Sequence, residues 1–268
     1  MAEPMNNLSG KEWLQYSFTI WKDIRKNPEE LKLKHPAMFP IQLCEKLIRI
    51  YTKDDGEVIL DPFMGVGSTV IAAKNLSRKS IGIDLSQEYF DKTKNRLYNY
   101  QNKLMGDNKT YNPEIYLGDS RVILKKLKKD SVDLCINSPP YWNILNQKRT
   151  ADNKEIVNYS DSDEDLGNLN DYKAFLNELK KVYSEVYRVL KPNKRCCVVV
   201  MDIRKKDKFY PLHLDISKIM DEIGFELEDF VIWDRQHEYN NMKTLGYPWV
   251  FRFNKVHEFI GIYWKRDK

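Results

Sequence analysis

Two passages of the sequence combine residue types and spacings that could bind and transform a small ligand. The first is the run Val-Ile-Leu-Asp-Pro-Phe-Met-Gly-Val-Gly-Ser-Thr at 58–69, which predicts an apolar strand, a glycine turn and a helix start. Glycines let the backbone approach a ligand, and open α/β sheets bind ligands at the carboxyl ends of their strands. A second apolar strand ends at Asp84, about twenty residues after Asp61, a spacing typical of a carboxylate that holds ribose hydroxyls. The passage predicts a site for a nucleoside-containing cofactor.

The second passage is a predicted strand at 132–136 followed by a turn stiffened by prolines. The turn contains Ser138, Pro139, Pro140, Tyr141 and Trp142. Prolines lack N–H donors, so carbonyl and hydroxyl oxygens remain as acceptors, while the two aromatic rings offer flat apolar faces. A stiff loop with core aromatics could show the same residues. The position at a strand end, beside the predicted cofactor site, favours a socket for a planar amine.

In both passages the chain resembles the S-adenosylmethionine-dependent DNA amino-methyltransferases, which modify N4 of cytosine or N6 of adenine. Asp-Pro-Phe-Met-Gly-Val-Gly-Ser resembles their cofactor motif, and Ser-Pro-Pro-Tyr resembles their catalytic tetrapeptide in the form most associated with N4-cytosine enzymes. The segment His-Pro-Ala-Met-Phe-Pro at 35–40 resembles the part that packs around the methionine end of the cofactor. Gly118-Asp119-Ser120 resembles the acidic motif after the third strand. The resemblance extends from about residue 35 to residue 265.

The resemblance implies an α/β fold of the Rossmann-like class I methyltransferase type. Its sheet would be seven-stranded and mostly parallel, with the last strand antiparallel and helices on both faces. It implies S-adenosyl-L-methionine as cofactor, with Asp84 on the ribose, Asp119 near the adenine and residues 61–67 beneath the methionine portion. The implied catalytic residues are Ser138, Pro139, Pro140 and Tyr141. The implied cofactor-binding residues are His35, Pro36, Ala37, Asp61, Pro62, Phe63, Gly65, Gly67, Ser68, Asp84, Leu85, Asp119 and Ser120.

A chemical mechanism follows from these assignments. The exocyclic amine of cytosine is a poor nucleophile because its lone pair is delocalised into the ring. Acceptors such as the Ser138 hydroxyl and the Pro139 carbonyl would hold the nitrogen toward tetrahedral geometry and aim its lone pair at the sulfonium methyl. In double-stranded DNA the target base would flip out and stack on Tyr141, with Trp142 alongside. We expect no covalent enzyme intermediate and no metal ion.

We therefore expect site-specific transfer of a methyl group to N4 of cytosine in DNA, in a restriction-modification system or as an orphan enzyme. A restriction endonuclease that acts on the same site would be its partner. N6-adenine methylation is the first alternative, although those enzymes usually carry Asp or Asn where Ser138 stands; RNA or protein amide methylation is another. A nucleic-acid-binding module without catalysis and a nicotinamide-dependent oxidoreductase also remain, the last disfavoured because position 70 is valine where Gly-x-Gly-x-x-Gly needs glycine.

The elements that must position these residues alternate between short apolar runs and amphipathic stretches, which is typical of a sheet covered by helices. The predicted strands are 58–60, 80–83, 114–117, 132–136, 196–202, 230–233 and 258–264. The predicted helices are 68–76, 87–104, 121–127, 172–190 and 212–223. Because the cofactor motif precedes the tetrapeptide, the strand order should follow the unpermuted methyltransferase arrangement.

The remaining segments suggest how the chain is organised. Residues 1–34 predict a helical N-terminal extension, with Trp13, Tyr16, Ile20 and Ile24 on a helical period. Residues 35–268 predict a single catalytic domain with inserted loops at 143–170 and 235–256, the candidate DNA-contact segments. The basic run 204–208 follows a strand and could contact phosphates, whereas the run 125–129 is expected to be solvated surface.

Composition limits the class of protein. The 268 residues are 42% hydrophobic and 31% charged, which fits a globular chain and excludes a collagen-like or low-complexity one. The net charge of +5 permits a polyanionic partner. The four cysteines form no CxxC pair and none follows a proline, so core thiols are expected rather than a metal site or a cysteine nucleophile. No apolar run approaches a membrane span and no signal peptide is evident, so we expect a cytoplasmic protein.

Overall fold

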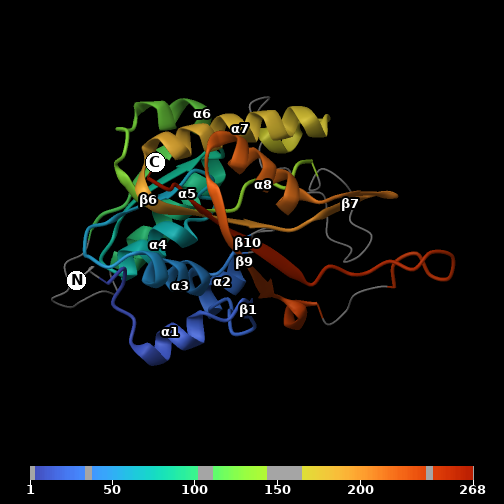
Figure 1. The fold of residues 1–268 in the computed structure, drawn as a ribbon, viewed down its shortest axis with the longest axis horizontal. Helices are drawn as coiled ribbons and strands as arrows, with labels where there is room; N and C mark the ends of the chain where they lie inside the picture. The colour runs from blue at the N-terminus through green and yellow to red at the C-terminus, as the bar shows by residue number, and fades with distance from the viewer. Residues whose placement is uncertain (1–3, 34–37, 102–110, 144–164, 240–243, 268) are drawn as a thin grey trace.

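The central sheet is built from the apolar runs that the sequence predicted as strands. In the computed structural model, which describes residues 4–33, 38–101, 111–143, 165–239 and 244–267, the sheet lies between two layers of helices (Figure 1). All the predicted strands are confirmed, several with longer bounds, although the one predicted at 196–202 begins earlier, at 190, and ends at 200. They are β2 (Val58–Asp61), β3 (Lys79–Asp84), β4 (Glu114–Leu117), β5 (Val132–Asn137), β6 (Leu190–Val200), β9 (Glu226–Asp234) and β10 (His257–Trp264).

The strand order places the predicted motifs at one edge of the sheet. Within the described residues the order is β1-β9-β10-β6-β5-β2-β3-β4. Strands β2 to β6 are mutually parallel, whereas β10 runs antiparallel to both β6 and β9, as expected for the last strand. After β2 the chain winds outward through β3 and β4 and returns on the other side of β2 as β5. Open α/β sheets bind ligands at such a reversal of strand order.

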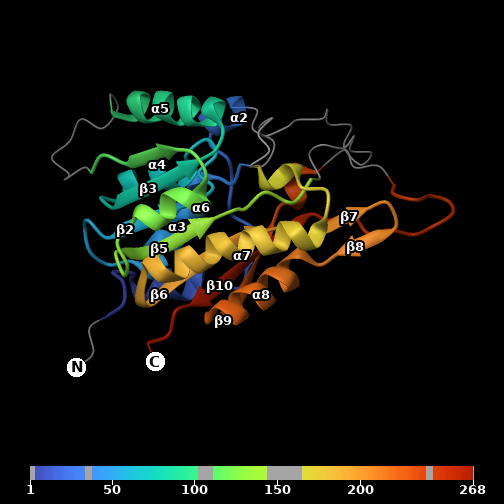
Figure 2. The ribbon, with the colours of Figure 1, turned by 90° about the horizontal axis from the view of Figure 1, so that it is seen from above.

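Helices cover both faces of the sheet (Figure 2). On one face lie α3 (Ile41–Tyr51), α4 (Ser68–Asn75) and α5 (Gln87–Gln101), and on the other lie α6 (Ser120–Ile123), α7 (Tyr172–Val189) and α8 (Leu212–Ile223). Helix α3 was not predicted, and the predicted helix 121–127 divides into α6 and the 3-10 turn η1 (Leu124–Lys126). The other predicted helices are confirmed, except that residues 102–104 of the one predicted at 87–104 lie outside the described residues.

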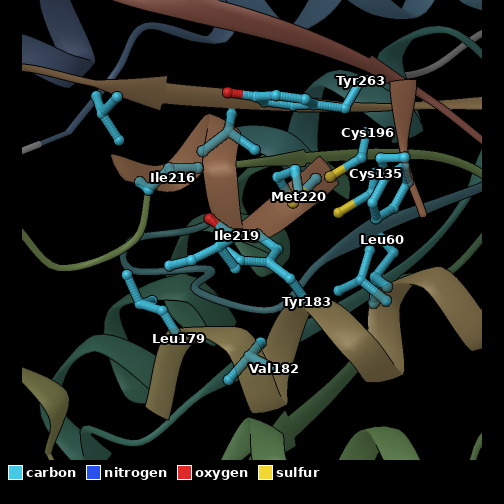
Figure 3. Close-up of a cluster of buried hydrophobic side chains, with 14 of the residues drawn as sticks. Leu60, Cys135, Leu179, Val182, Tyr183, Cys196, Ile216, Ile219, Met220 and Tyr263 are labelled. Atoms are coloured by element: carbon cyan, nitrogen blue, oxygen red, sulfur yellow. The ribbon is translucent and has the colours of Figure 1, made fainter. Parts of the chain in front are cut away.

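Helix α7 shows how the apolar period becomes core. Its side chains at threes and fours are buried, and the Asp171 carboxylate caps its first turn by accepting the Ala174 N–H at 2.7 Å. Figure 3 shows α7 and α8 facing the sheet, where Tyr183 and Met220 lie close to the thiols of Cys135 and Cys196. All four cysteines of the chain are free and buried, which confirms them as core thiols.

The N-terminal stretch departs from the helical prediction. It contains α1 (Gly10–Tyr16), then the short strand β1 (Ile20–Trp21), then α2 (Pro28–Lys32). Strand β1 pairs in parallel with β9, and the Thr19 carbonyl accepts the Ile232 N–H at 2.7 Å. Trp21 and Ile24 are buried in the core cluster beneath α3. The open backbone edge of β9 and the apolar burial together favour a strand here, so the sheet among the described residues has eight strands, not seven.

A second unpredicted feature is a small hairpin formed by β7 (Ile203–Lys205) and β8 (Lys208–Tyr210). It carries the basic run 204–208 and projects beyond the carboxyl ends of the parallel strands (Figure 2). The sequence there is too short and too charged to show an alternating pattern, so only the antiparallel pairing reveals the strands.

Candidate active site

A cavity lies at the reversal of strand order, where the ends of β2, β3, β4 and β5 meet. Its empty volume, which includes solvent at the open mouth, is about 880 Å³. The predicted residues that line it are Pro62, Phe63, Gly65, Ser68, Asp84, Leu85, Asp119, Ser120, Ser138 and Pro140. Residues more than seventy positions apart in the sequence therefore converge on one cavity, as the resemblance implied.

The loop between β2 and α4 forms the floor of the cavity, and Asp61 holds it from inside the protein. Its carboxylate accepts the Phe63 N–H at 3.0 Å and the Thr69 hydroxyl at 2.6 Å, and the side chain is fully buried. Burial raises the Asp61 pKa to about 7. Asp61 does not line the cavity, so its role in this structure is to shape the loop.

Further contacts fix the glycine turn from the α5 side. The Thr93 hydroxyl donates to the Gly65 carbonyl at 3.0 Å, and the Arg96 guanidinium donates to the Val66 carbonyl. Gly67 has a φ of +83°, and a Cβ there would lie 2.6 Å from the Thr93 methyl carbon. Gly67 supports the turn without lining the cavity, and only glycine fits its conformation and its neighbour.

Asp84 extends from the end of β3 into the cavity wall. Its carboxylate accepts the Gly65 N–H at 2.7 Å and the Ser86 N–H at 2.9 Å. Burial, and to a smaller extent the neighbouring Asp165 charge, raises the Asp84 pKa to about 6. Because an ionised carboxylate offers about four lone-pair sites, acceptor capacity remains for a ligand that carries hydroxyl groups.

Asp119 and Ser120 bring the end of β4 to the same cavity. The Asp119 carboxylate caps α6 through the Arg121 N–H at 2.7 Å and pairs with the Arg121 guanidinium. The Ser120 hydroxyl donates to the Pro62 carbonyl and so joins the β4 end to the β2 loop. Both residues are committed to internal contacts, although both still line the cavity.

The tetrapeptide after β5 is tied to the far side of the sheet through a chain of hydrogen bonds. The Tyr141 hydroxyl donates to Glu258 of β10 at 2.8 Å and lies 3.2 Å from the Ser138 hydroxyl. Glu258 also forms an ion pair with Arg235, which holds its second oxygen. Burial and then the Glu258 charge raise the Tyr141 pKa well above its usual value, so the phenol stays protonated and acts as a donor. Since its single proton goes to Glu258, its oxygen accepts from Ser138.

Trp142 does not take the place expected for it beside a flipped base. The indole is only 5% exposed, and its Nε1–H donates to the Leu169 carbonyl at 2.7 Å. The rings of Tyr172 and Tyr210 pack against it at centroid distances of 5.2 and 5.1 Å. The prediction was wrong because the turn directs this side chain into the core formed with α7 and β8.

The structure brings together most, but not all, of the predicted residues. Pro139 and Tyr141 flank the lining residues Ser138 and Pro140 in the chain but do not themselves line the cavity, and His35, Pro36 and Ala37 lie outside the described residues. Other lining residues lie within the predicted motifs 35–40, 61–67 and 118–120, and these are Met38, Phe39, Met64, Val66 and Gly118. Four lining residues were missed: Ser86, Asp165, Leu166 and Val182. Ser86 directly follows Asp84 and Leu85 and could have been found by extending that pair. No local pattern marks the lining residues from α7 and the 3-10 turn η3 (Leu166–Asn168).

Across the part of the chain that the structure describes, no group of three or more His, Cys, Asp or Glu side chains is placed to hold a metal ion. Among the same residues, no helix has the length and apolarity needed to cross a membrane. The cavity and the tetrapeptide beside it together form the candidate active site.

Strand order, carboxyl-edge cavity and helices on both faces define a Rossmann-like methyltransferase fold, as expected. A SAM-dependent methyltransferase of Methanosarcina mazei shares this fold, with 13% identity and a TM-score of 0.51 over 80% of this chain and 95% of that one. The family model for DNA methylases matches residues 2–95 and 132–268. The chain belongs to this DNA methylase family.

Curated relatives match a shorter stretch. The orphan methyltransferase M.BamHII of Bacillus amyloliquefaciens is 37% identical over 87 residues, which is 31% of this chain and 32% of that protein. The type II methyltransferase M2.DpnII of Streptococcus pneumoniae is 42% identical over 79 residues, or 29% of each chain. The matched part thus spans about a third of the length of these relatives.

Proposed function

We propose that the protein is a site-specific DNA methyltransferase that transfers a methyl group from S-adenosyl-L-methionine to N4 of cytosine. The observation that carries this proposal is the meeting of Ser138 and Pro140 with Asp84 and Asp119 around one cavity. A methyl donor and a target amine need adjacent sites of this kind, because alignment supplies much of the rate. Membership of the DNA methylase family supports the choice of DNA as substrate.

The residues of the cavity fit S-adenosyl-L-methionine. Asp84 retains acceptor capacity for ribose hydroxyls, Asp119 lies at the adjoining β4 end, and Phe39, Phe63 and Val66 provide apolar wall. When bound, the cofactor supplies a methyl group activated by its sulfonium. The β2 loop is already held by Asp61, Asp84 and Thr93, so binding would order little additional backbone.

The hydrogen-bond chain behind the tetrapeptide prepares Ser138 to accept. Because its proton is donated to Tyr141, the lone pairs of the Ser138 oxygen are available to the cavity. An N–H of the target amine would donate to this oxygen, and the other to the Pro139 carbonyl, which turns the nitrogen lone pair toward the methyl group. Glu258 and Arg235 act through Tyr141 and are positioning residues. The flipped cytosine would stack on the face of Tyr141, and no covalent bond to the protein is needed.

The choice of cytosine rests on Ser138 and is tested by the product. The protein would be incubated with unmethylated duplex DNA and S-adenosyl-L-methionine, and the digested nucleosides analysed by mass spectrometry. We expect N4-methylcytosine. N6-methyladenine would establish the alternative base, and transfer to no DNA substrate would favour a binding module without catalysis.

The biological setting is proposed on the relatives. One is a type II methyltransferase and another an orphan methyltransferase, so we infer a role in a restriction-modification system or as a solitary modification enzyme in the cytoplasm. In the first case a restriction endonuclease that cleaves the same sequence would be the partner. Single-molecule sequencing of DNA from cells that express the protein would reveal the modified site, which could then be challenged with restriction enzymes.

A further inference from the structure

The segment between η4 (Gln236–Glu238) and β10 displays aromatic side chains to solvent. We call the described residues 244–256 the aromatic arm. Five of its apolar side chains are 50 to 88% exposed, and Trp249, at 88%, is more exposed than Trp13, at 49%. They are Tyr247, Trp249, Val250, Phe251 and Phe253. In Figure 1 the arm is the red loop that extends away from the sheet beside β7. Apolar groups gathered in this way usually mark an interaction surface.

The arm has a defined backbone conformation, so the exposure is built into the fold. Leu245 and Arg252 form an antiparallel bridge that closes the loop. The Gly246 carbonyl accepts the N–H groups of Trp249 at 2.9 Å and Val250 at 2.7 Å, and Gly246 itself has a φ of +77°. The rings of Phe251 and Phe253 meet edge to face with centroids 5.2 Å apart. The local fold therefore holds the rings outward.

The surroundings of the arm are basic. The Arg252 guanidinium bonds to the Lys206 carbonyl at 3.1 Å and pairs with Asp207, which ties the arm to the β7–β8 hairpin. The Arg204 guanidinium and the Lys255 ammonium each lie 5.4 Å from the centroid of the Phe209 ring. The cations of the hairpin and arm are Arg204, Lys205, Lys206, Lys208, Arg252 and Lys255, against the one carboxylate of Asp207 in these two segments. Exposed aromatics among cations suit a nucleic acid better than an apolar protein face.

The hairpin also connects the arm to the tetrapeptide. The Lys205 ammonium lies 4.2 Å from the centroid of the Trp142 ring and donates to the Asn143 side chain at 3.1 Å. Trp142 directly follows Tyr141 in the chain. Figures 1 and 2 agree that hairpin and arm lie together beyond the carboxyl ends of the parallel strands. DNA whose base enters the cavity would thus pass beside the arm.

We propose that the aromatic arm inserts its rings into the base stack of duplex DNA beside the target base and holds open the gap that the flipped base leaves. This inference rests on the proposed function. Apolar and aromatic side chains that enter a base step unstack it, and aromatic rings stack on bases without regard to sequence. Cations of the hairpin would meanwhile contact the flanking phosphates. The arm would therefore reduce the cost of flipping rather than read the recognition sequence.

The test compares a paired with an unpaired target base. The variant Trp249→Ala/Phe251→Ala is assayed for kcat/KM on a duplex with a normal target pair and on the same duplex with a mismatch at the target base. We expect at least a tenfold loss on the paired duplex and less than a threefold loss on the mismatched one. Equal loss on both substrates, or no loss on either, would overturn the proposed insertion of the arm. Phe18→Ala, an exposed aromatic at the β1 edge, is the matched control and should change neither value.

A binding measurement separates this inference from the proposed function. A fluorescent adenine analogue next to the target base brightens when its neighbour is unstacked, whether or not methyl transfer occurs. Wild-type protein should brighten it, and the double variant at saturating concentration should not. Brightening of the probe by both proteins would contradict insertion of the arm. If wild-type protein methylated no DNA yet still brightened the probe, the proposed function would be wrong, whereas insertion of the arm would be supported. A concentration-dependent dimer in sedimentation that the double variant abolishes would show that a second copy, not DNA, occupies the arm.

Discussion

The β2 loop at 62–67 and the aromatic arm are both turns that contain glycine, yet they differ in what holds them and in where their apolar side chains face. The β2 loop is held by side chains from β2, β3, α5 and α6, and its apolar residues face inward. The arm is closed mainly by its own backbone and turns its apolar residues outward. A small cofactor is bound by a preorganised cavity, whereas a long polymer must be met by a surface that projects. The following predictions test whether the cavity binds the cofactor and the projecting surface binds DNA.

Loss of the acceptor in the cavity should have the largest effect. We expect Ser138→Ala to lower kcat by roughly 100-fold to 1000-fold, because an acceptor that orients the amine in the transition state is removed. Affinity for S-adenosyl-L-methionine, measured by calorimetry, should be unchanged. Tyr141→Phe should lower kcat less, because the ring remains and only the bond that directs the Ser138 proton is lost. A Ser138→Ala enzyme with wild-type kcat would contradict the amine site.

The ribose assignment of Asp84 is tested by cofactor affinity. Asp84→Ala should weaken S-adenosyl-L-methionine binding by about 100-fold, since charged hydrogen bonds are worth about 1.5–3 kcal/mol each. The wild-type affinity should also fall as the pH drops below about 6, because protonation of Asp84 removes acceptor capacity. Asp84→Asn keeps the side-chain volume, and its affinity should lose that pH dependence. If the calorimetric affinity of Asp84→Ala for S-adenosyl-L-methionine were unchanged, the assignment of Asp84 to the ribose would be wrong.

Asp61 should affect stability rather than binding. Its pKa is about 7 in the folded protein and 3.8 in the unfolded reference, so the folded state retains a proton that the unfolded state has lost between these values. Stability from this group therefore decreases as the pH rises from about 4 to 7, by up to about 1.4 kcal/mol per pH unit. In urea titrations at pH 5 and pH 8, Asp61→Asn should show a smaller decrease than wild type. An identical decrease in both proteins would show that the carboxyl does not titrate in this way.

The smallest effect belongs to a single phosphate contact of the basic hairpin. Arg204→Gln should weaken DNA binding a few-fold and reduce the slope of log affinity against log salt by about 1. Lys125→Gln is the matched control, because this exposed lysine follows α6 in the basic run expected to be solvated surface. Fluorescence anisotropy at several salt concentrations gives both slopes. Equal slopes for Arg204→Gln and wild type would contradict a phosphate contact by Arg204 of the hairpin.

The amino-acid sequence by itself determined the alternation of elements and most of the cavity. Short apolar runs with turn residues between them predicted β2 to β6, β9 and β10, and the motifs at the strand ends must converge because parallel strands end at one edge. The position of Ser138 and Asp84 on one cavity follows from these local patterns together with the strand order.

Tertiary structure alone decided how similar residues divide their tasks. Asp61 and Asp84 both end apolar strands, yet the first is enclosed by its own loop and the second reaches the cavity. Trp142 is buried because Tyr172 of α7 and Tyr210 of β8 pack against its ring, whereas Trp249 is exposed. The partner of Tyr141 is Glu258, 117 positions away. The strand at Ile20–Trp21 likewise forms because β9 offers a free edge. Such contacts depend on surfaces that exist only after the sheet has assembled, so no local pattern records them.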